Sequence, residues 1–391
     1  MRLKLITALV LAGLVPSTAK AVPTQPFAIF TIGDSLSDTG NLSATEDLPP
    51  RGIYFGDTAA FDAIFVADSE PYRRYSDGPV WIERLEERLG GTPDWNSYIR
   101  ADWERAFGRG LDEGVGLPTG STGVIQSSDP SAAFGANFAF GGAQTDNVLF
   151  GAAPSSLADQ AAFVGGVATR GALVAPPTSD QIDRSLFVVQ GGGNDFFKIT
   201  NPSEAPSVLQ TAVDNLARII TDLAGDGAEH ILVPNLPGYA VADDWLAANP
   251  ADIRTLSAGF NALLALELDA LRATLGVDIY EVDWFGLFDD MLADPANFGL
   301  ANTDAPCADF DASSVLESLC SDPASYLMFD ALHPSSTAHQ AMADAAWDAL
   351  AGFNPGSVTG AVPEPATALL MLATLGWVRR RNAAPRAASP Q

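Results

Sequence analysis

A serine, a histidine and an aspartate stand in this chain where they could act together in nucleophilic catalysis. Ser35 lies in the turn-forming stretch Gly33 to Asn41, directly after the apolar run Phe27 to Ile32, which predicts a buried strand. A serine at the end of a strand lies at a sheet edge, where a substrate can reach it. His333 follows much later, shortly after Asp330. These residue types can carry out acyl transfer, with serine as nucleophile, histidine as base and aspartate as the group that orients the base.

Few residues could act as the base, because the chain holds only 3 histidines. We interpret His230, at the start of a predicted strand, and His339, within a predicted helix, as structural. Ser335 or Ser336 is expected to cap that helix, because a serine side chain can accept a hydrogen bond from the free N–H groups of the first turn. The spacing therefore places His333 on a short loop anchored by a helix.

Acyl transfer also needs hydrogen-bond donors for the negative charge that develops on the carbonyl oxygen. Gly141 is our candidate for a backbone donor, with Gly142 as the neighbouring candidate, because glycine lets an N–H approach a ligand closely. Asn194 offers a side-chain amide, and the backbone N–H of Ser35 is a further donor. We interpret nearby carboxylates as groups that order these turns and do not catalyse, namely Asp38 and Asp195.

The elements that must position these residues follow from the hydrophobic pattern. Five short apolar runs predict strands: Phe27 to Ile32, Ala136 to Phe140, Leu186 to Gln190, Ile231 to Pro234 and Val277 to Val282. Apolar residues repeat every three or four positions over residues 208–223 and 256–271, which predicts helices. Alternating strands and helices predict a parallel sheet covered on both faces. Polar or Gly-rich turns after the first three strands are then expected to meet in one crevice.

Residues 42–130 interrupt this alternation. They are rich in Gly, Pro, Asp, Tyr and Trp, and only Val80 to Leu89 is clearly helical. Long irregular segments of this kind often form lids or substrate-binding walls, so we interpret the segment as an insertion over the sheet edge. Its tryptophans could line a substrate wall or pack in the core: Trp81, Trp95 and Trp103.

The composition is that of a folded and strongly acidic protein. The chain has 391 residues, of which 47% are hydrophobic and 18% charged, which argues against global disorder. Its net charge of -27 repels nucleic acid and anionic membrane surfaces, and we interpret the acidity as a solvated surface. Calcium binding is a weaker alternative, because Asp289, Asp290 and the carboxylates of residues 304–311 do not follow the EF-hand spacing.

The N-terminus predicts export. Arg2 and Lys4 precede the apolar run Leu5 to Val15, and Ala19 to Ala21 fits a small-residue cleavage site. We therefore interpret residues 1–21 as a signal peptide.

Export leads to an oxidising compartment, where two cysteines usually pair. Cys307 and Cys320 are the only cysteines of the chain, so a disulfide between them is expected. Closing a loop of this length contributes roughly 3 kcal/mol in the chain-entropy model. No metal site is expected, because no histidine or second cysteine pair stands at ligand spacing.

The C-terminus carries Val362 to Pro365, then the apolar run Ala366 to Val378, then Arg379 to Arg381. The run is shorter than the about 20 residues of a bilayer span. The arrangement resembles a PEP-CTERM sorting signal. That resemblance implies an exosortase as processing partner, transient membrane anchoring through the tail, and a protein secreted to the cell envelope or extracellular matrix of a Gram-negative bacterium.

Four ordered motifs resemble those of the GDSL, or SGNH, hydrolases: Gly33 to Asn41, Asn137 to Ala143, Gly192 to Asp195, and Asp330 to His333. The resemblance implies a three-layer α/β/α SGNH-hydrolase fold with a flavodoxin-like five-stranded parallel sheet. It implies a catalytic triad of Ser35, Asp330 and His333, and an oxyanion hole made by Ser35, Gly141 and Asn194. No metal or organic cofactor is required.

We therefore expect four regions: a signal peptide over residues 1–21, a hydrolase domain over 22–351, a linker over 352–362 and a sorting tail over 363–391. The predicted function is that of an exported serine ester hydrolase, an esterase or lipase, acting on a lipid or acylated sugar through an acyl-enzyme. Alternatives are a polysaccharide O-acetylesterase, a phospholipase or acyltransferase on the same fold, and a non-catalytic surface or matrix protein. Nucleic acid is not an expected partner.

Overall fold

The computed structural model describes residues 26, 28–39, 74–90, 134–146, 156–162, 182–238, 253–310 and 316–353. Residue contacts divide the chain into two units, Met1–Pro355 and Gly356–Gln391, and every described residue belongs to the first. Several predictions lie outside the described residues, namely the signal peptide, the sorting tail, most of the insertion with Trp95 and Trp103, and nearly all of the linker.

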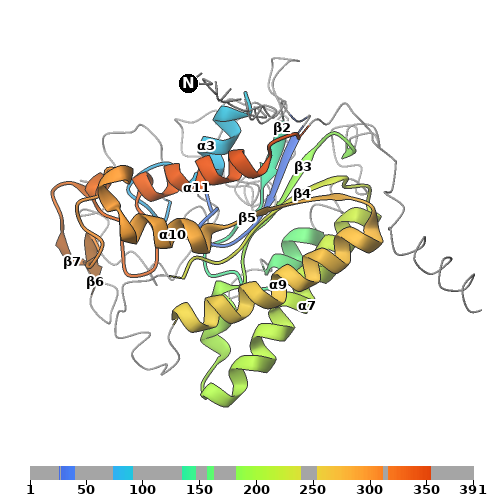
Figure 1. Ribbon diagram of the computed structural model, residues 1–391, viewed down its shortest axis with the longest axis horizontal. Coiled ribbons are helices and arrows are strands. Elements are labelled where there is room, and N and C mark those ends of the chain that lie inside the picture. Colours follow the sequence, from blue (N-terminus) through green and yellow to red (C-terminus); the bar gives the residue numbers. More distant parts are fainter. Residues whose placement is uncertain are drawn as a thin grey trace, which may run out of the picture. The chain divides into compact units, whose positions relative to one another are not determined.

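A five-stranded sheet lies at the centre of the structure (Figure 1), with the strand order β2-β1-β3-β4-β5. All neighbouring strands run parallel, which confirms the predicted α/β architecture. The strands are β1 (Ala28–Ile32), β2 (Phe134–Asn137), β3 (Leu186–Val189), β4 (His230–Pro234) and β5 (Asp278–Val282).

Strand β2 lies earlier than predicted, because the run Ala136 to Phe140 straddles its end. Phe138 and Phe140 still donate backbone hydrogen bonds to Thr31 and Gly33, at 2.8 and 3.0 Å. The chain therefore stays beside β1 as it enters the turn at Gly141, and the turns after the two strands remain adjacent.

Both faces of the sheet are covered, as expected for a parallel sheet with apolar strands. Side chains alternate between the faces along a strand. In β1, Phe30 and Ile32 belong to the core formed with α7 (Ala205–Gly225) and α9 (Ile253–Leu275). Ile29 belongs to the core on the opposite face.

The opposite core is formed with α3 (Trp81–Arg88), α10 (Trp284–Ala293) and α11 (Ser336–Ala349) (Figure 1). Helices α3, α7 and α9 match the predicted helical stretches. Sequence periodicity did not predict α10, which is short and includes Gly286 and two consecutive aspartates. Its start is set by Asp283, whose side chain accepts a hydrogen bond from Gly286 N at 2.9 Å.

A small antiparallel hairpin of β6 (Ala308–Phe310) and β7 (Leu316–Leu319) precedes the predicted base. The Cys307–Cys320 disulfide flanks it, with an S–S distance of 1.99 Å, which confirms the predicted pairing. Backbone N–H groups of Cys307 and Ala308 donate to the carbonyls of Met328 and Phe329 at 3.1 and 2.7 Å. The disulfide-closed hairpin is thus bonded to the residues directly before Asp330.

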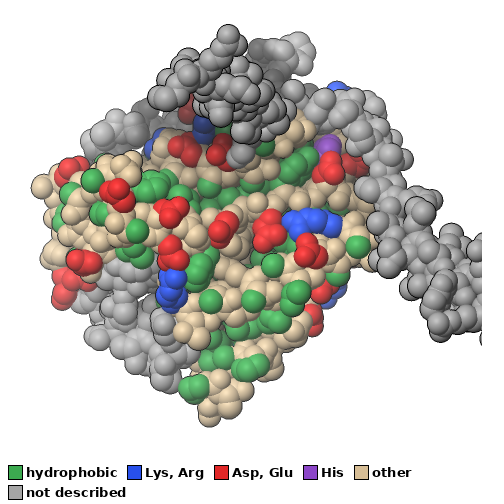
Figure 2. All heavy atoms as spheres, in the orientation of Figure 1, with side chains coloured by type: hydrophobic (Ala, Val, Ile, Leu, Met, Phe, Trp, Pro, Cys, Tyr) green, Lys and Arg blue, Asp and Glu red, His purple; other side chains and the backbone are tan. Residues whose placement is uncertain are grey.

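Short 3-10 helices also occur among the described residues, namely η1 (Gly193–Lys198), η2 (Pro202–Glu204), η3 (Pro295–Phe298) and η4 (Pro323–Ser325). On the face that Figure 2 shows, acidic side chains are distributed among apolar and neutral ones, and basic side chains are fewer. Within the part of the chain that the structure describes, no helix has the length and apolarity needed to cross a membrane.

Candidate active site

The structure brings together the three residues predicted as nucleophile, base and orienting acid. His333 Nε2 lies 2.9 Å from Ser35 Oγ. On the other side of the ring, His333 Nδ1 lies 2.7 and 2.9 Å from the two carboxylate oxygens of Asp330. Ser35 and His333 are 8% and 5% exposed, so the hydrogen bonds between them are largely shielded from water. This arrangement allows His333 to take a proton from Ser35 while Asp330 holds the ring.

The Asp330 carboxylate also sets the shape of the loop that carries His333. Its Oδ1 accepts backbone hydrogen bonds from Leu332 and His333, at 2.8 and 2.7 Å. The helix cap follows at once, because Ser335 Oγ accepts from Ala338 N at 3.3 Å at the start of α11. Of the two serines predicted as possible caps, Ser335 takes that position. The base therefore lies on a short loop anchored by a helix, as predicted.

Two glutamines hold the turn that carries Ser35. Gln160 bonds to both backbone groups of Gly33, accepting from its N at 2.8 Å and donating to its carbonyl at 2.9 Å. Gln190 donates to the Asp34 carboxylate at 2.9 Å and accepts from Ser37 Oγ at 2.8 Å. Both amides are buried, so these bonds fix the nucleophile turn against the end of β3 and against residues 156–162.

Asp34 is a buried carboxyl directly before the nucleophile. Burial raises its pKa, while hydrogen bonds from Leu36 N and Gln190 act in the opposite direction. Asp34 Oδ1 accepts the Leu36 N–H at 3.0 Å, and Ser37 N donates to the Asp34 carbonyl at 3.0 Å. Asp34 therefore shapes the turn and leaves Ser35 directed at His333.

The predicted oxyanion glycine has a different partner in this structure. Gly141 N donates a 2.8 Å hydrogen bond to the carboxylate of Asp38, which is buried. That N–H is therefore already engaged, and Gly141 as a donor to substrate stays a prediction. Gly142, its neighbouring candidate, adopts a φ of 76°, which favours glycine. Asp38 orders this turn, in line with its predicted role.

Asn194 lies at the start of η1, beside the turn after β2. Its Nδ2 donates to the Ala143 carbonyl at 3.0 Å, and its own carbonyl accepts from Gln144 Nε2 at 2.8 Å. An amide nitrogen carries two hydrogens, so the second remains a candidate donor for a substrate oxygen. The oxyanion role of Asn194 and of the Ser35 backbone N–H stays a prediction.

Asp195 joins the same two turns through a buried carboxylate. It accepts from Thr145 N at 2.9 Å and from Thr145 Oγ1 at 2.8 Å. Lys198 donates to it at 2.8 Å and also pairs with Asp146. Partial burial lowers the pKa of Lys198, but its hydrogen bonds to the carboxylates of Asp146 and Asp195, and the attraction of their charges, outweigh burial and raise that pKa. Asp195 thus acts as the predicted ordering group.

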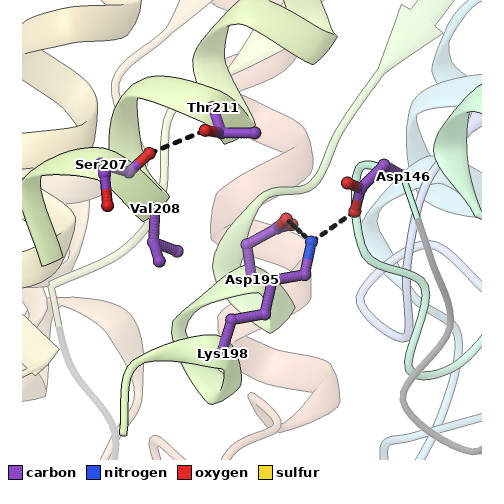
Figure 3. A pocket seen from close by; sticks show the side chains of 6 residues that line it. All are labelled: Asp146, Asp195, Lys198, Ser207, Val208 and Thr211. Carbon is purple, nitrogen blue, oxygen red and sulfur yellow. Dashed lines mark hydrogen bonds and ion pairs between the residues drawn. The ribbon is translucent and has the colours of Figure 1, made fainter. Parts of the chain in front are cut away.

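A cavity of about 390 Å³ lies beside this group (Figure 3). Lys198 points toward Asp146 and Asp195 on one side, and residues of α7 line the other. The lining is mixed, with one apolar side chain, hydroxyls and charged groups, namely Asp146, Asp195, Lys198, Ser207, Val208 and Thr211. One of its lining residues, Asp195, directly follows Asn194 in the chain.

The remaining histidines contact neither Ser35 nor Asp330 by any described hydrogen bond. His339 is fully buried in α11, and its Nδ1 accepts a hydrogen bond from Trp81 N at 3.2 Å, as expected of a structural histidine. Burial lowers its pKa to about 3. His230, at the start of β4, is also buried, and burial lowers its pKa. Trp81 packs in the core against Trp284, with ring centroids 4.9 Å apart.

Sequence reasoning missed Gln160, Gln190 and Tyr75, all of which contact the site. Gln190 gave a usable signal, because it is a polar residue that ends an apolar strand run and precedes three glycines. Gln160 and Tyr75 carry no such pattern. Among the described residues, no group of three or more His, Cys, Asp or Glu side chains could hold a metal ion.

Comparison with known proteins agrees with this geometry. Residues 29–346 match the family model described as GDSL-like Lipase/Acylhydrolase. Among curated proteins, the chain is similar to GDSL esterase/lipase At1g29660 of Arabidopsis thaliana, with 24% identity over 84% of this chain and 89% of the relative. It is also similar to GDSL esterase/lipase At1g29670 of the same plant, with 25% identity over 82% of this chain and 86% of the relative.

Proposed function

The chain belongs to the family of GDSL-like lipases and acylhydrolases and is an ester hydrolase, and on that premise we propose that it is an exported serine hydrolase of carboxylic esters. The observation that carries the proposal is His333, whose two ring nitrogens lie within hydrogen-bond distance of Ser35 and Asp330. A histidine bonded in this way can activate a serine hydroxyl at neutral pH, with the acid fixing its tautomer.

The proposed reaction proceeds through an acyl-enzyme. Ser35 Oγ attacks the ester carbonyl while its proton passes to His333 Nε2, and the developing negative charge falls on the carbonyl oxygen. His333 then gives that proton to the departing alcohol as the ester C–O bond breaks. Water attacks the Ser35 ester in the same manner, releasing the acid and restoring the hydroxyl. Asp330 stabilises the imidazolium in both halves of the reaction.

The proposed oxyanion donors lie on the turns that follow β1, β2 and β3. They are the backbone N–H of Ser35, the free hydrogen of Asn194 Nδ2 and a glycine N–H at the turn after β2. If Gly141 is that donor, Asp38 must first release its N–H. If Gly142 serves, Asp38 stays in place and holds the turn. Activity of an Asp38→Asn variant separates these cases, because the amide oxygen accepts the Gly141 N–H more weakly than the carboxylate does. Activity should be kept or raised if Gly141 is the donor, and should fall if Gly142 is the donor and needs the turn held in place.

The direct test of the proposed function is a Ser35→Ala protein assayed on p-nitrophenyl acetate and on longer acyl esters. We expect loss of turnover and loss of labelling by a serine-reactive fluorophosphonate, because both need the Ser35 hydroxyl. Ser203→Ala is the matched control, since Ser203 is an exposed serine on η2 that bonds to Asn201. Undiminished turnover by Ser35→Ala would reject the assignment, and the absence of labelling in the wild type would favour a non-catalytic surface protein.

Acylated sugars form a second candidate substrate class, and the cavity beside η1 favours them. Its lining of hydroxyls, carboxylates and an ammonium suits a hydroxylated group better than a long acyl chain. We propose Val208→Trp to fill the cavity, with Leu266→Trp as control because Leu266 is 71% exposed on α9. If sugars occupy the cavity, Val208→Trp lowers acetate release from an acetylated polysaccharide and spares p-nitrophenyl acetate. Equal effects on both substrates would show that the cavity does not bind the sugar part selectively and would reject this assignment.

Export and tail processing are separate proposals that rest on the two chain ends. Residues 1–21 supply the pattern of a signal peptide, and residues 363–391 that of a sorting tail read by an exosortase. Mass spectrometry of the protein from an exosortase-bearing Gram-negative host tests both. We expect an N-terminus near Val22 and loss of the residues after the Pro363 to Pro365 motif. An intact Gln391 terminus would contradict processing.

A further inference from the structure

A short segment of the predicted insertion, residues 74–80, is bonded to the loop that carries the base. Ser76 Oγ donates to the Pro334 carbonyl at 3.0 Å. The Asp77 carboxylate accepts from Ser336 N at 2.6 Å and from Ser336 Oγ at 2.8 Å. Pro334 and Ser336, one and three residues after His333, are therefore bonded to this segment.

The same segment is also fixed on its other side. Arg74 pairs with the buried Glu83 of α3, with a 2.7 Å bond from Nε, and Val80 N donates to the same carboxylate at 2.7 Å. Tyr75 thus stands between anchored neighbours. These contacts hold the backbone of Tyr75 close to Pro334 and so to the base.

Tyr75 occupies that position against the face of the base. The Tyr75 and His333 ring centroids lie 4.8 Å apart, with 35° between the ring planes. The hydroxyl end of the phenol lies against Gly141, where an added Cβ would come within 2.6 Å of Tyr75 Oη, Cε2 and Cζ. Tyr75 is only 6% exposed. One aromatic ring therefore contacts both the base and the turn predicted to hold the oxyanion glycine.

We propose that Tyr75 is a positioning residue for the base, whose ring holds the His333 imidazole in line with Ser35. The proposal rests on the proposed ester hydrolysis at Ser35. Asp330 holds one edge of the imidazole through Nδ1, but a hydrogen bond at one edge still allows the ring to tilt out of its plane. A ring packed on the face of the imidazole opposes that tilt. Small misplacements of a reacting group reduce turnover strongly.

The proposal assigns the effect to the ring of Tyr75 and not to its hydroxyl. Tyr75→Phe should keep kcat within about twofold of wild type, whereas Tyr75→Ala should lower kcat roughly ten- to hundredfold with KM little changed. Tyr280→Ala is the matched control, because Tyr280 also packs beside a buried histidine, His230, with centroids 6.2 Å apart, but on a different strand end. We expect its kcat to equal that of the wild type.

A second readout does not depend on turnover. In NMR spectra, the proton between His333 Nδ1 and Asp330 should give a strongly downfield resonance. We expect that resonance to persist in Tyr75→Phe and to broaden through faster exchange with water in Tyr75→Ala. If Tyr75→Ala does not fold, as judged by its circular dichroism, Tyr75→Leu replaces it. A wild type that lacks esterase activity would contradict the proposed function, and the resonance would still test the positioning role.

Two outcomes overturn the proposal. A folded Tyr75→Ala protein with wild-type kcat and an unchanged resonance would show that the imidazole is held without the ring. A Tyr75→Phe protein as impaired as Tyr75→Ala would assign the effect to the hydroxyl. The proposal is supported if kcat falls in Tyr75→Ala and not in Tyr280→Ala, and if Tyr75→Phe keeps a kcat close to that of the wild type.

Discussion

The two ends of the central sheet each hold a buried histidine beside an aspartate and a tyrosine. At the carboxyl end these are His333, Asp330 and Tyr75, and at the amino end His230, Asp278 and Tyr280. Residue types alone do not distinguish the two groups. Their geometry does, because His333 Nδ1 lies 2.7 Å from its carboxylate and His230 Nδ1 lies 3.3 Å from its own.

The environments of the two aspartates differ as well. Asp330 is 13% exposed and also accepts two backbone hydrogen bonds, whereas Asp278 is 60% exposed. Burial lowers the pKa of His230, and the nearby Asp278 only partly offsets this. A serine hydroxyl completes the first group through His333 Nε2. Of these two histidines, only His333 has what the proposed reaction requires of a base, a shielded acid on one nitrogen and a serine hydroxyl on the other.

The strongest test of this difference replaces each histidine in turn. His333→Asn should lower kcat on the order of 10⁵-fold or more, because loss of the base removes the activation of Ser35. His230→Asn should leave kcat unchanged, since no described hydrogen bond joins that ring to a serine. Steady-state kinetics on p-nitrophenyl acetate measures both, with circular dichroism to verify folding. Comparable losses in the two variants would mean that the amino end takes part in the reaction.

The two aspartates give the next comparison. Asp330→Asn should lower kcat about 10⁴-fold, because the amide no longer fixes the tautomer of His333 or stabilises its protonated form. Asp278→Asn should have no measurable effect on kcat, because Asp278 is exposed and lies at the amino end of the sheet. The same ester assay applies. A mild effect of Asp330→Asn would indicate that His333 is oriented mainly by other contacts, such as the Tyr75 ring.

Much of the fold could be predicted from the sequence because the strands and long helices carry strong local patterns. The five apolar runs correspond to the five parallel strands, and the three- and four-residue periodicity corresponds to α7 and α9. The end of β2 was misplaced, since Phe138 and Phe140 remain apolar and buried after the strand has ended. Helix α10 was missed because a short buried helix has little periodicity to detect.

The chemistry of the site was also visible in the motifs, whereas its supports were not. Ser35, Asp330 and His333 stand in recognisable turns, and the structure places them in hydrogen-bond contact. The bond from Gly141 N to Asp38 could not be foreseen, because it joins residues more than one hundred positions apart. Contacts of Gln160 with Gly33, and of Tyr75 with His333, likewise depend on tertiary packing and leave no local pattern.

The disulfide distinguishes the two ends in a further way, because it lies beside the loop of Asp330 only. A Cys307→Ala, Cys320→Ala double variant should lose roughly 3 kcal/mol of unfolding free energy, as the unfolded chain is no longer constrained. Denaturant unfolding measures this loss. Hydrogen exchange should increase at the amides of residue 307 and Ala308, which donate to the carbonyls of Met328 and Phe329, and not at the amide of His230. Uniform exchange changes would contradict a local role for the disulfide.

His339 offers a third case for comparison, because it is a buried histidine with no described carboxylate partner. Its pKa is lowered to about 3 from 6.5 by burial, so the folded protein leaves it neutral where the unfolded chain binds a proton. Unfolding free energy should therefore fall as pH drops below 6.5, by at most about 1.4 kcal/mol per pH unit from this group.

Replacing His339 by glutamine removes that titration and keeps an acceptor for Trp81 N. His339→Gln should therefore flatten the pH dependence of unfolding free energy between pH 6.5 and about 5, a difference of up to about 2 kcal/mol. His230→Gln should flatten it less, because Asp278 favours the protonated form of His230 and opposes the effect of burial. Urea titrations at several pH values give both slopes. If the two variants flattened the pH dependence equally, Asp278 would contribute nothing to the protonation of His230. Burial alone would then determine how both histidines titrate.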